Sequence, residues 1–150
     1  MLNTFKKFLA DEQHTEMFIT GQAGTGKTTG LAELVANCIA TNVDHTVCAF
    51  THKACGILAS KLPKEANIQT LHKYLKKRPT INTEASNYKH IESSLRQGQA
   101  EETAVLFIDE YSMIGERDLM DIRDTQDLIE EVTGKELKIV WLGDPNQLPP

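Results

Sequence analysis

The stretch Gly21-Gln22-Ala23-Gly24-Thr25-Gly26-Lys27-Thr28 follows a short apolar run, Met17-Phe18-Ile19. It fits the pattern G-x-x-x-x-G-K-[ST], in which glycines let successive backbone N–H groups approach phosphate oxygens. Lys27 adds a positive charge for the terminal phosphates, and the Thr28 hydroxyl can ligate Mg²⁺. The residues from Thr29 to Ala40 have a helical pattern, so a helix N-terminus would also face the anion. The stretch therefore predicts a nucleoside triphosphate site built on a strand, a loop and a helix.

Outward from this stretch, apolar runs alternate with helical patterns along the chain. Short runs rich in Val, Ile, Phe or Trp predict buried strands at Met17–Thr20, Thr46–Phe50, Ala104–Ile108 and Leu137–Leu142. Apolar residues at i, i+3, i+4 spacing predict helices at Lys27–Ala40, Lys53–Leu62 and Glu116–Val132. This alternation predicts an α/β fold, a parallel sheet flanked by helices. Because Trp141 lies inside an apolar run, we expect it to pack in the core.

One segment, Arg78 to Glu102, departs from the alternation. It is mostly polar, contains Pro79 and Gly98, and has no core-forming periodicity. A stretch of that length between two strands is usually functional or a small inserted subdomain. We therefore expect residues 1–77 and 103–150 to form the main domain and residues 78–102 to form an insertion.

Composition and charge limit the possible settings of the protein. The 150 residues are 40% hydrophobic and 25% charged, and no apolar stretch approaches the roughly 20 residues of a membrane-spanning helix. The N-terminus lacks the apolar core of a signal peptide, so we expect a soluble, cytoplasmic protein. Three cysteines, Cys38, Cys48 and Cys55, have no C-x-x-C spacing, and we expect buried free thiols.

The net charge of −5 gives no bulk electrostatic argument for nucleic-acid binding. Such binding would need a local groove. One local basic cluster exists, formed by Lys73, Lys76, Lys77 and Arg78. A charge run of this kind is more often a solvated surface, and charge alone leaves both interpretations open.

Two further apolar runs end in polar residues that complete the chemistry. Val105-Leu106-Phe107-Ile108 leads into Asp109 and Glu110. Asp109 lies where a carboxylate for Mg²⁺ is needed, and Glu110 can orient and deprotonate the attacking water. The run ending at Leu142 leads into Gly143-Asp144-Pro145-Asn146-Gln147. Gln147 is neutral, which suits contact with a γ-phosphate oxygen or the attacking water.

At these residues the chain resembles the first motor domain of superfamily 1 helicases, in the RecD-like and Dda-like branch that moves 5′→3′ on single-stranded DNA. Gly21–Thr28 is similar to motif I, Asp109-Glu110-Tyr111-Ser112-Met113 to motif II, and Gly143 to Pro150 to motif III. Phe50-Thr51-His52-Lys53-Ala54 resembles motif Ia, with Phe50 where proline is usual. Thr70-Leu71-His72 resembles the short segment that follows motif Ia in this branch.

The resemblance implies a RecA-like P-loop ATPase domain (domain 1A) and roles for the matched residues. The cofactors would be ATP and Mg²⁺, with catalytic roles for Glu110, Lys27 and Gln147. The nucleotide would lie on Gly21, Gln22, Ala23, Gly24, Thr25, Gly26, Lys27, Thr28, Thr29, Asp109 and Gln147, with the metal on Thr28 and Asp109. Single-stranded DNA, the expected partner, would follow Thr51, His52, Lys53, Thr70 and His72. The insertion would be the pin subdomain (1B-like), with Tyr88 as a candidate wedge.

The same resemblance implies a second motor domain, which supplies an arginine across the nucleotide and is not found within these 150 residues. Replication or recombination proteins are possible further partners. Two alternatives stay open: another P-loop enzyme, such as an AAA+ ATPase or a nucleotide kinase, and a non-catalytic module that binds nucleotide or single-stranded DNA. Gln13 lies closer to the phosphate loop than the family's adenine-reading glutamine usually does, so the residue that reads the base is unassigned.

Overall fold

The computed structural model describes residues 1–21, 26–75 and 103–144. Several predicted features lie outside these ranges: residues 22–25 of the phosphate loop, the segment 78–102 with Tyr88, and Gln147. Within the described part of the chain, no helix has the length and apolar character needed to cross a bilayer.

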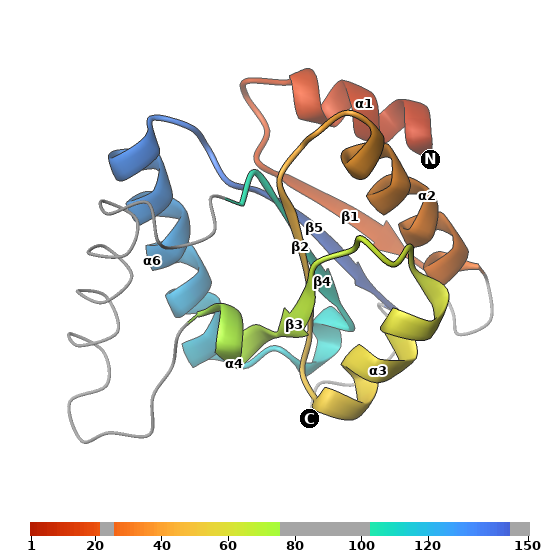
Figure 1. Ribbon diagram of the computed structural model, residues 1–150. Helices are drawn as coiled ribbons and strands as arrows, with labels where there is room; N and C mark the ends of the chain where they lie inside the picture. The colour runs from red at the N-terminus through yellow and green to blue at the C-terminus, as the bar shows by residue number, and fades with distance from the viewer. Residues whose placement is uncertain (22–25, 76–102, 145–150) are drawn as a thin grey trace.

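Five parallel strands form a single sheet in the order β1-β5-β4-β2-β3 (Figure 1). The strands are β1 (Glu16–Thr20), β2 (His45–Ala49), β3 (Ile68–Thr70), β4 (Val105–Asp109) and β5 (Lys138–Gly143). Every adjacent pair runs parallel. The two central strands β4 and β5 are almost wholly buried, as expected when both faces of a parallel sheet are covered. The expected α/β fold with a parallel sheet is confirmed.

Helices cover both faces of this sheet. Figure 1 shows α1 (Leu2–Ala10), α2 (Lys27–Ala40) and α3 (His52–Lys61) on one face, and α4 (Leu71–Tyr74) and α6 (Glu116–Thr133) on the other. The alternation of side chains along β4 separates two cores: Val105 and Phe107 pack beneath the first set, and Leu106 and Ile108 beneath the second. Trp141 lies in the second core with 3% of its surface exposed, which confirms its predicted packing role.

The predicted elements match the structure with small shifts. Helix α2 has the predicted bounds, and the other predicted helices and strands end within about one residue of their expected ends. Among the described residues, four elements were not predicted: α1, β3, α4 and the 3-10 helix η1 (Tyr111–Met113). Among the cysteines, Cys38 and Cys48 are buried as expected, whereas Cys55 is only partly buried, so the prediction was wrong for that thiol.

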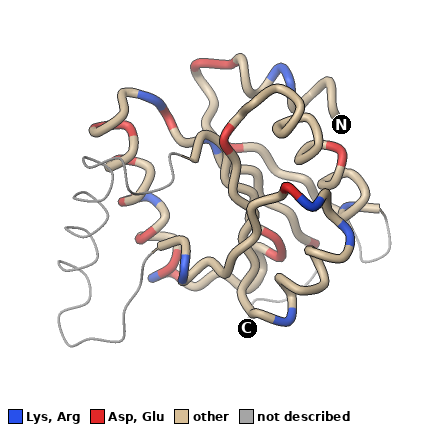
Figure 2. Tube along the Cα trace, viewed as in Figure 1, with Lys and Arg blue, Asp and Glu red and all other residues tan. Residues whose placement is uncertain are grey.

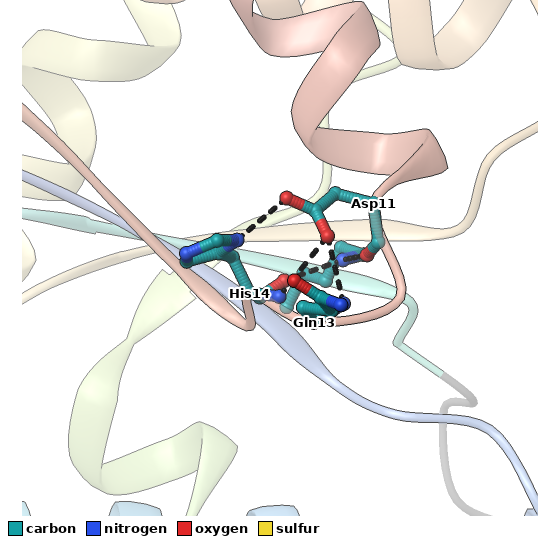
Figure 3. Close-up of polar contacts among 4 residues, drawn as sticks. Asp11, Gln13 and His14 are labelled. Carbon is teal, nitrogen blue, oxygen red and sulfur yellow. Dashed lines mark hydrogen bonds and ion pairs between the residues drawn. The ribbon is translucent and has the colours of Figure 1, made fainter.

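A tight polar turn joins α1 to β1 (Figure 3). The Asp11 carboxylate accepts a 2.7 Å hydrogen bond from the Gln13 N–H and lies 2.6 Å from His14 Nδ1. The Gln13 N–H bond and then the His14 contact lower the pKa of Asp11 from its ordinary value. The backbone of Gln13 is therefore part of the turn that begins β1.

Acidic residues are concentrated on α6, as Figure 2 shows. This helix carries seven acidic residues and two arginines. Its charge equals the net charge of −5 for the whole chain. Helix α3, on the other face, contains no acidic residue and carries His52, Lys53 and Lys61. The acidic composition of the chain therefore says little about the charge near α3.

A close contact joins the end of β5 to the short 3-10 helix η1 (Tyr111–Met113). A Cβ added at Gly143 would lie 2.6 Å from Cε1 of Tyr111, closer than real Cβ contacts allow. The Tyr111 ring also packs edge-on against Phe18 of β1, with ring centroids 6.0 Å apart. Glycine at position 143 thus lets one aromatic ring lie across the ends of two strands.

We predict that Gly143→Ala lowers the free energy of unfolding by about 1–3 kcal/mol, because Tyr111 must move from a packed position. Denaturant unfolding measures the change, and a Tyr111→Ala background should remove most of it. Gly56→Ala is the matched control, because a Cβ there meets nothing within 4 Å. Within α3 that change should stabilise the protein by roughly 0.5–1 kcal/mol. Equal losses for Gly143→Ala in both backgrounds would rule out the Tyr111 contact as the cause.

Candidate nucleotide and nucleic-acid site

The carboxyl ends of the parallel strands bring the predicted motifs to one edge of the sheet. Gly21 follows β1, Asp144 follows β5, and Asp109 is the last residue of β4. The Gly21 N–H donates a 3.2 Å hydrogen bond to the Gly143 carbonyl, which ties the start of the phosphate loop to the start of motif III. In an open α/β sheet this edge is the usual ligand site.

Helix α2 begins in the geometry that anion binding requires. Its N-cap, Gly26, has φ +86°, a left-handed conformation that glycine adopts without steric cost. Lys27, Thr28 and Thr29 form the first helical turn, and this turn contains no acidic residue. Free N–H groups, the helix dipole and the Lys27 ammonium therefore all favour a negatively charged ligand here.

Opposing influences act on the pKa of Asp109, which lies at the end of β4 beside Glu110. Burial raises the pKa of Asp109, and the neighbouring Glu110 charge raises it further. The Glu110 N–H and the Lys27 ammonium act in the opposite direction and only partly offset the rise. The influence of Lys27 places motif I and motif II in one electrostatic environment, and that environment holds negative charge without full compensation.

Glu110 has a strained backbone. Its φ of +60° and ψ of +61° are left-handed values, which cost a residue with a Cβ roughly 1–2 kcal/mol. Its carbonyl accepts a 3.0 Å bond from the Met113 N–H, and the Ser112 hydroxyl donates a 3.1 Å bond to Glu110 Oε1. Sequence reasoning gave Ser112 no role. The structure makes it a hydrogen-bond donor to the predicted catalytic base.

The predicted DNA-binding threonines both cap helices. Thr51 is the N-cap of α3, and its hydroxyl oxygen accepts a 3.0 Å bond from the Ala54 N–H. Thr70 is the N-cap of α4, and its hydroxyl oxygen accepts a 3.2 Å bond from the Lys73 N–H. Because a hydroxyl can donate while it accepts, each threonine keeps an O–H for a second partner.

The two capped helices form a repeated unit. Strands β2 and β3 pair in register, with Ala49 opposite Thr70, so both helices begin at the same edge. His52 and Lys53 lie in the first turn of α3 and are exposed, as are His72 and Lys73 in α4. The structure thus brings together all five predicted DNA-binding residues on two neighbouring strand-to-helix connections.

Two contacts near this edge were not predicted. His72 Nε2 lies 3.5 Å from Asp118 Oδ1 in the first turn of α6, across the interface between α4 and α6. Arg123 Nη2 lies 2.6 Å from Glu16 Oε1, the oxygen that also accepts a 3.0 Å bond from Trp141 Nε1. Arg123 is therefore a structural partner of β1. No spacing in the sequence indicated either contact, because each joins residues far apart in the chain.

Comparisons with known proteins agree with this geometry. A family model described as an AAA domain matches residues 8–150. The structure of Bacteroides sp Pif1 in complex with ADP-AlF4 is 26% identical, with a TM-score of 0.63, and the match covers 99% of this chain and 32% of that chain. Unliganded Pif1 from Bacteroides sp is 27% identical, with a TM-score of 0.59 and the same coverage.

Among curated proteins, an uncharacterized protein of Acanthamoeba polyphaga mimivirus is 28% identical over an aligned length of 167 residues. The match covers 99% of this chain and 32% of that protein. The chain thus spans about a third of the length of the relatives it matches. The family match covers nearly the whole chain. The motifs occur along the chain in the same order as in the helicases that it resembles. The chain belongs to the AAA domain family and is a first motor domain of the superfamily 1 helicase type.

Proposed function

We propose that this chain is the ATP-hydrolysing motor domain of a DNA helicase. It binds ATP–Mg²⁺ and single-stranded DNA, and couples hydrolysis to 5′→3′ translocation and duplex unwinding. The observation that carries this proposal is the shared sheet edge, where the first turn of α2, the Asp109–Glu110 pair and the two threonine-capped helices all lie. A nucleotide site and a site for single-stranded DNA on the same rigid edge of the sheet suit a domain that couples ATP hydrolysis to movement along DNA.

For the nucleotide, the roles follow from the chemistry of each group. Residues 21–29 would offer N–H groups to the phosphates, and Lys27 would neutralise charge on the terminal phosphates. Glu110, whose Oε1 accepts a hydrogen bond from the Ser112 hydroxyl, would accept a proton from the attacking water. Gln147 contacts the γ-phosphate in this proposal; it lies outside the described residues.

The donor set at this edge suits Mg²⁺. Thr28 and Asp109 offer hydroxyl and carboxylate oxygens, the ligand types that Mg²⁺ prefers. Burial and then the neighbouring Glu110 charge raise the pKa of Asp109, and a divalent cation bound there would favour its ionised form. When bound, the ion would neutralise charge on the β- and γ-phosphates.

For DNA, the threonine-capped helices provide contacts that do not depend on base sequence. The O–H groups of Thr51 and Thr70 and the Lys53 ammonium can all bind phosphate oxygens. Adjacent strands of a sheet lie about 4.8 Å apart, so the two connections can contact neighbouring phosphates of one strand. The exposed Lys73, in the same short helix, adds positive charge beside Thr70.

In this proposal, translocation and duplex unwinding also require a second motor domain. The matched relatives extend over about three times the length of the match, which leaves room for such a domain in proteins of this kind. Its arginine would stabilise charge on the γ-phosphate, a contribution of roughly 10³–10⁵ in rate for such residues. Arg123 does not supply this charge, because Glu16 binds it.

The decisive experiment measures ATPase activity of the chain with and without oligothymidylate. We expect slow hydrolysis that DNA stimulates, and Lys27→Ala should abolish nucleotide binding measured by calorimetry. Glu110→Gln should keep binding and lose turnover by roughly 10²–10⁴-fold. Phosphorylation of an added acceptor would indicate a kinase, and binding of ATP without any turnover would indicate a non-catalytic module.

A second prediction separates the capping role of Thr51 from its DNA role. Thr51→Ser keeps the cap and the O–H donor, so both stability and oligothymidylate affinity should stay close to those of the wild type. Thr51→Asp keeps the cap, because aspartate is an equally good N-cap, but it replaces the donor with a negative charge. We expect unchanged thermal stability and at least a roughly tenfold loss of DNA affinity. Unchanged affinity in Thr51→Asp would remove Thr51 from the DNA site.

A third prediction concerns the buried charge of Asp109. Because the folded-state pKa of Asp109 is raised, the contribution of this residue to stability is most favourable below its unfolded-state pKa and is lost as the pH rises through its folded-state pKa. Asp109→Asn should therefore raise the Tm of the nucleotide-free protein at neutral pH, and this gain should vanish below pH ~4. The same variant should lose the stabilisation that ATP–Mg²⁺ gives to the wild type. The exposed Asp124→Asn is the control, with little expected effect on either quantity. A lower Tm for Asp109→Asn at neutral pH would contradict the argument.

A further inference from the structure

The contact between His72 and Asp118 determines how the histidine can meet DNA. The Asp118 side chain is largely buried, with 18% of its surface exposed, whereas the His72 side chain is 62% exposed. Oδ1 of Asp118 faces Nε2 of His72 at 3.5 Å. The carboxylate is thus set within the protein surface, and the imidazole extends from it toward solvent.

A carboxylate in this position makes His72 a poor phosphate ligand. The Nε2 atom faces Asp118, and a phosphate brought to the same nitrogen would approach a second anion at short range. If the imidazole is protonated, Asp118 already balances its charge. With 62% of its side chain exposed, however, His72 is accessible to a base and can stack on it.

The residues of α3 provide the contrast. Within the described residues, no carboxylate lies at ion-pair distance from His52 or Lys53. The α3 connection therefore offers uncompensated positive charge, and the α4 connection offers an aromatic ring with a neighbouring anion. The two strand-to-helix connections thus have the same backbone arrangement but present different side chains to a bound DNA strand.

We propose that Asp118 is a positioning residue that holds His72 for stacking on a nucleobase, and that Lys53 and the threonines, not His72, bind the phosphates. The inference rests on the proposed function, since it divides the DNA site into a base contact and phosphate contacts. Asp118 acts through His72 and does not touch DNA. Helix α6 begins six residues after Glu110. Asp118, in the first turn of α6, therefore also links the base contact to the helix that follows the proposed catalytic carboxylates.

The test compares the binding of oligothymidylate with that of an abasic oligomer of the same length. Loss of stacking costs about 1–3 kcal/mol per base, or roughly 5- to 150-fold in affinity. His72→Ala and Asp118→Ala should weaken oligothymidylate binding within this range and leave abasic binding within about twofold. His72→Phe keeps a ring, and Asp118→Asn keeps a side-chain oxygen near the position of Nε2, so each should retain most of the affinity.

Salt dependence separates the two kinds of contact. Lys53→Gln should reduce the slope of log affinity against log salt by about 0.7 for each lost phosphate contact on a single strand. His72→Ala should leave the slope unchanged. Asp124→Asn, which removes an exposed negative charge from the same helix, is the control for a general charge effect.

Three outcomes would overturn the inference. The first is a slope change in His72→Ala equal to that of Lys53→Gln. The second is tighter binding of both oligomers by Asp118→Asn and Asp118→Ala, which would make Asp118 a repelling charge only. The third is no effect of Asp118→Ala on either oligomer. In all three, a normal Lys53→Gln result leaves the proposed function standing, whereas a wild-type chain that binds neither oligomer would defeat both proposals.

Discussion

The common direction of the five strands is the constraint on which the rest of the domain depends. Because all adjacent pairs are parallel, every strand ends at the same edge. Helices α2, α3 and α4 follow β1, β2 and β3 and so begin at that edge, where the first N–H groups of a helix have no partner within the helix. Residues distant in the chain, such as Lys27 and Asp109, thereby influence the same small region. An antiparallel sheet of the same strands would divide these groups between two edges.

That convergence brings like charges together, and the fold tolerates the cost at the functional edge. Asp109 is half-buried beside Glu110 with only partial compensation from Lys27, and Glu110 has a left-handed backbone. Both features oppose stability in the nucleotide-free protein. The rest of the sheet supplies the stability, through two separate cores and the close packing of Tyr111 on Gly143. In the proposed function, a divalent cation bound at this edge would offset the negative charge of Asp109 and Glu110.

The sequence predicted the elements that carry strong local patterns. The glycine-rich stretch and the i, i+3, i+4 spacing located α2, and continuous apolar runs located β4 and β5, because strands buried on both faces need apolar residues throughout. Helix α1 was missed although Leu2, Phe5 and Phe8 have helical spacing, and Phe5 and Phe8 are buried against the sheet. Strand β3 and helix α4 contain three and four residues. Elements so short depend on pairing with β2 and on packing beneath the sheet, which no window of local sequence contains.

The candidate site, like the fold, was predicted from the sequence only in part. The motifs predicted which residues gather at the edge, because parallel strands require them to meet there. They did not predict the capping role of Thr51 and Thr70, the bond from Ser112 to Glu110, or the contact of Asp118 with His72. The last of these depends on the packing of α4 beside α6, two elements that the strand β4 and a long insertion separate in the chain. Helix α6 also carries seven acidic residues on the face opposite α3. A polyanion near this edge would therefore be repelled by α6 and attracted toward α3, where Thr51 caps the helix.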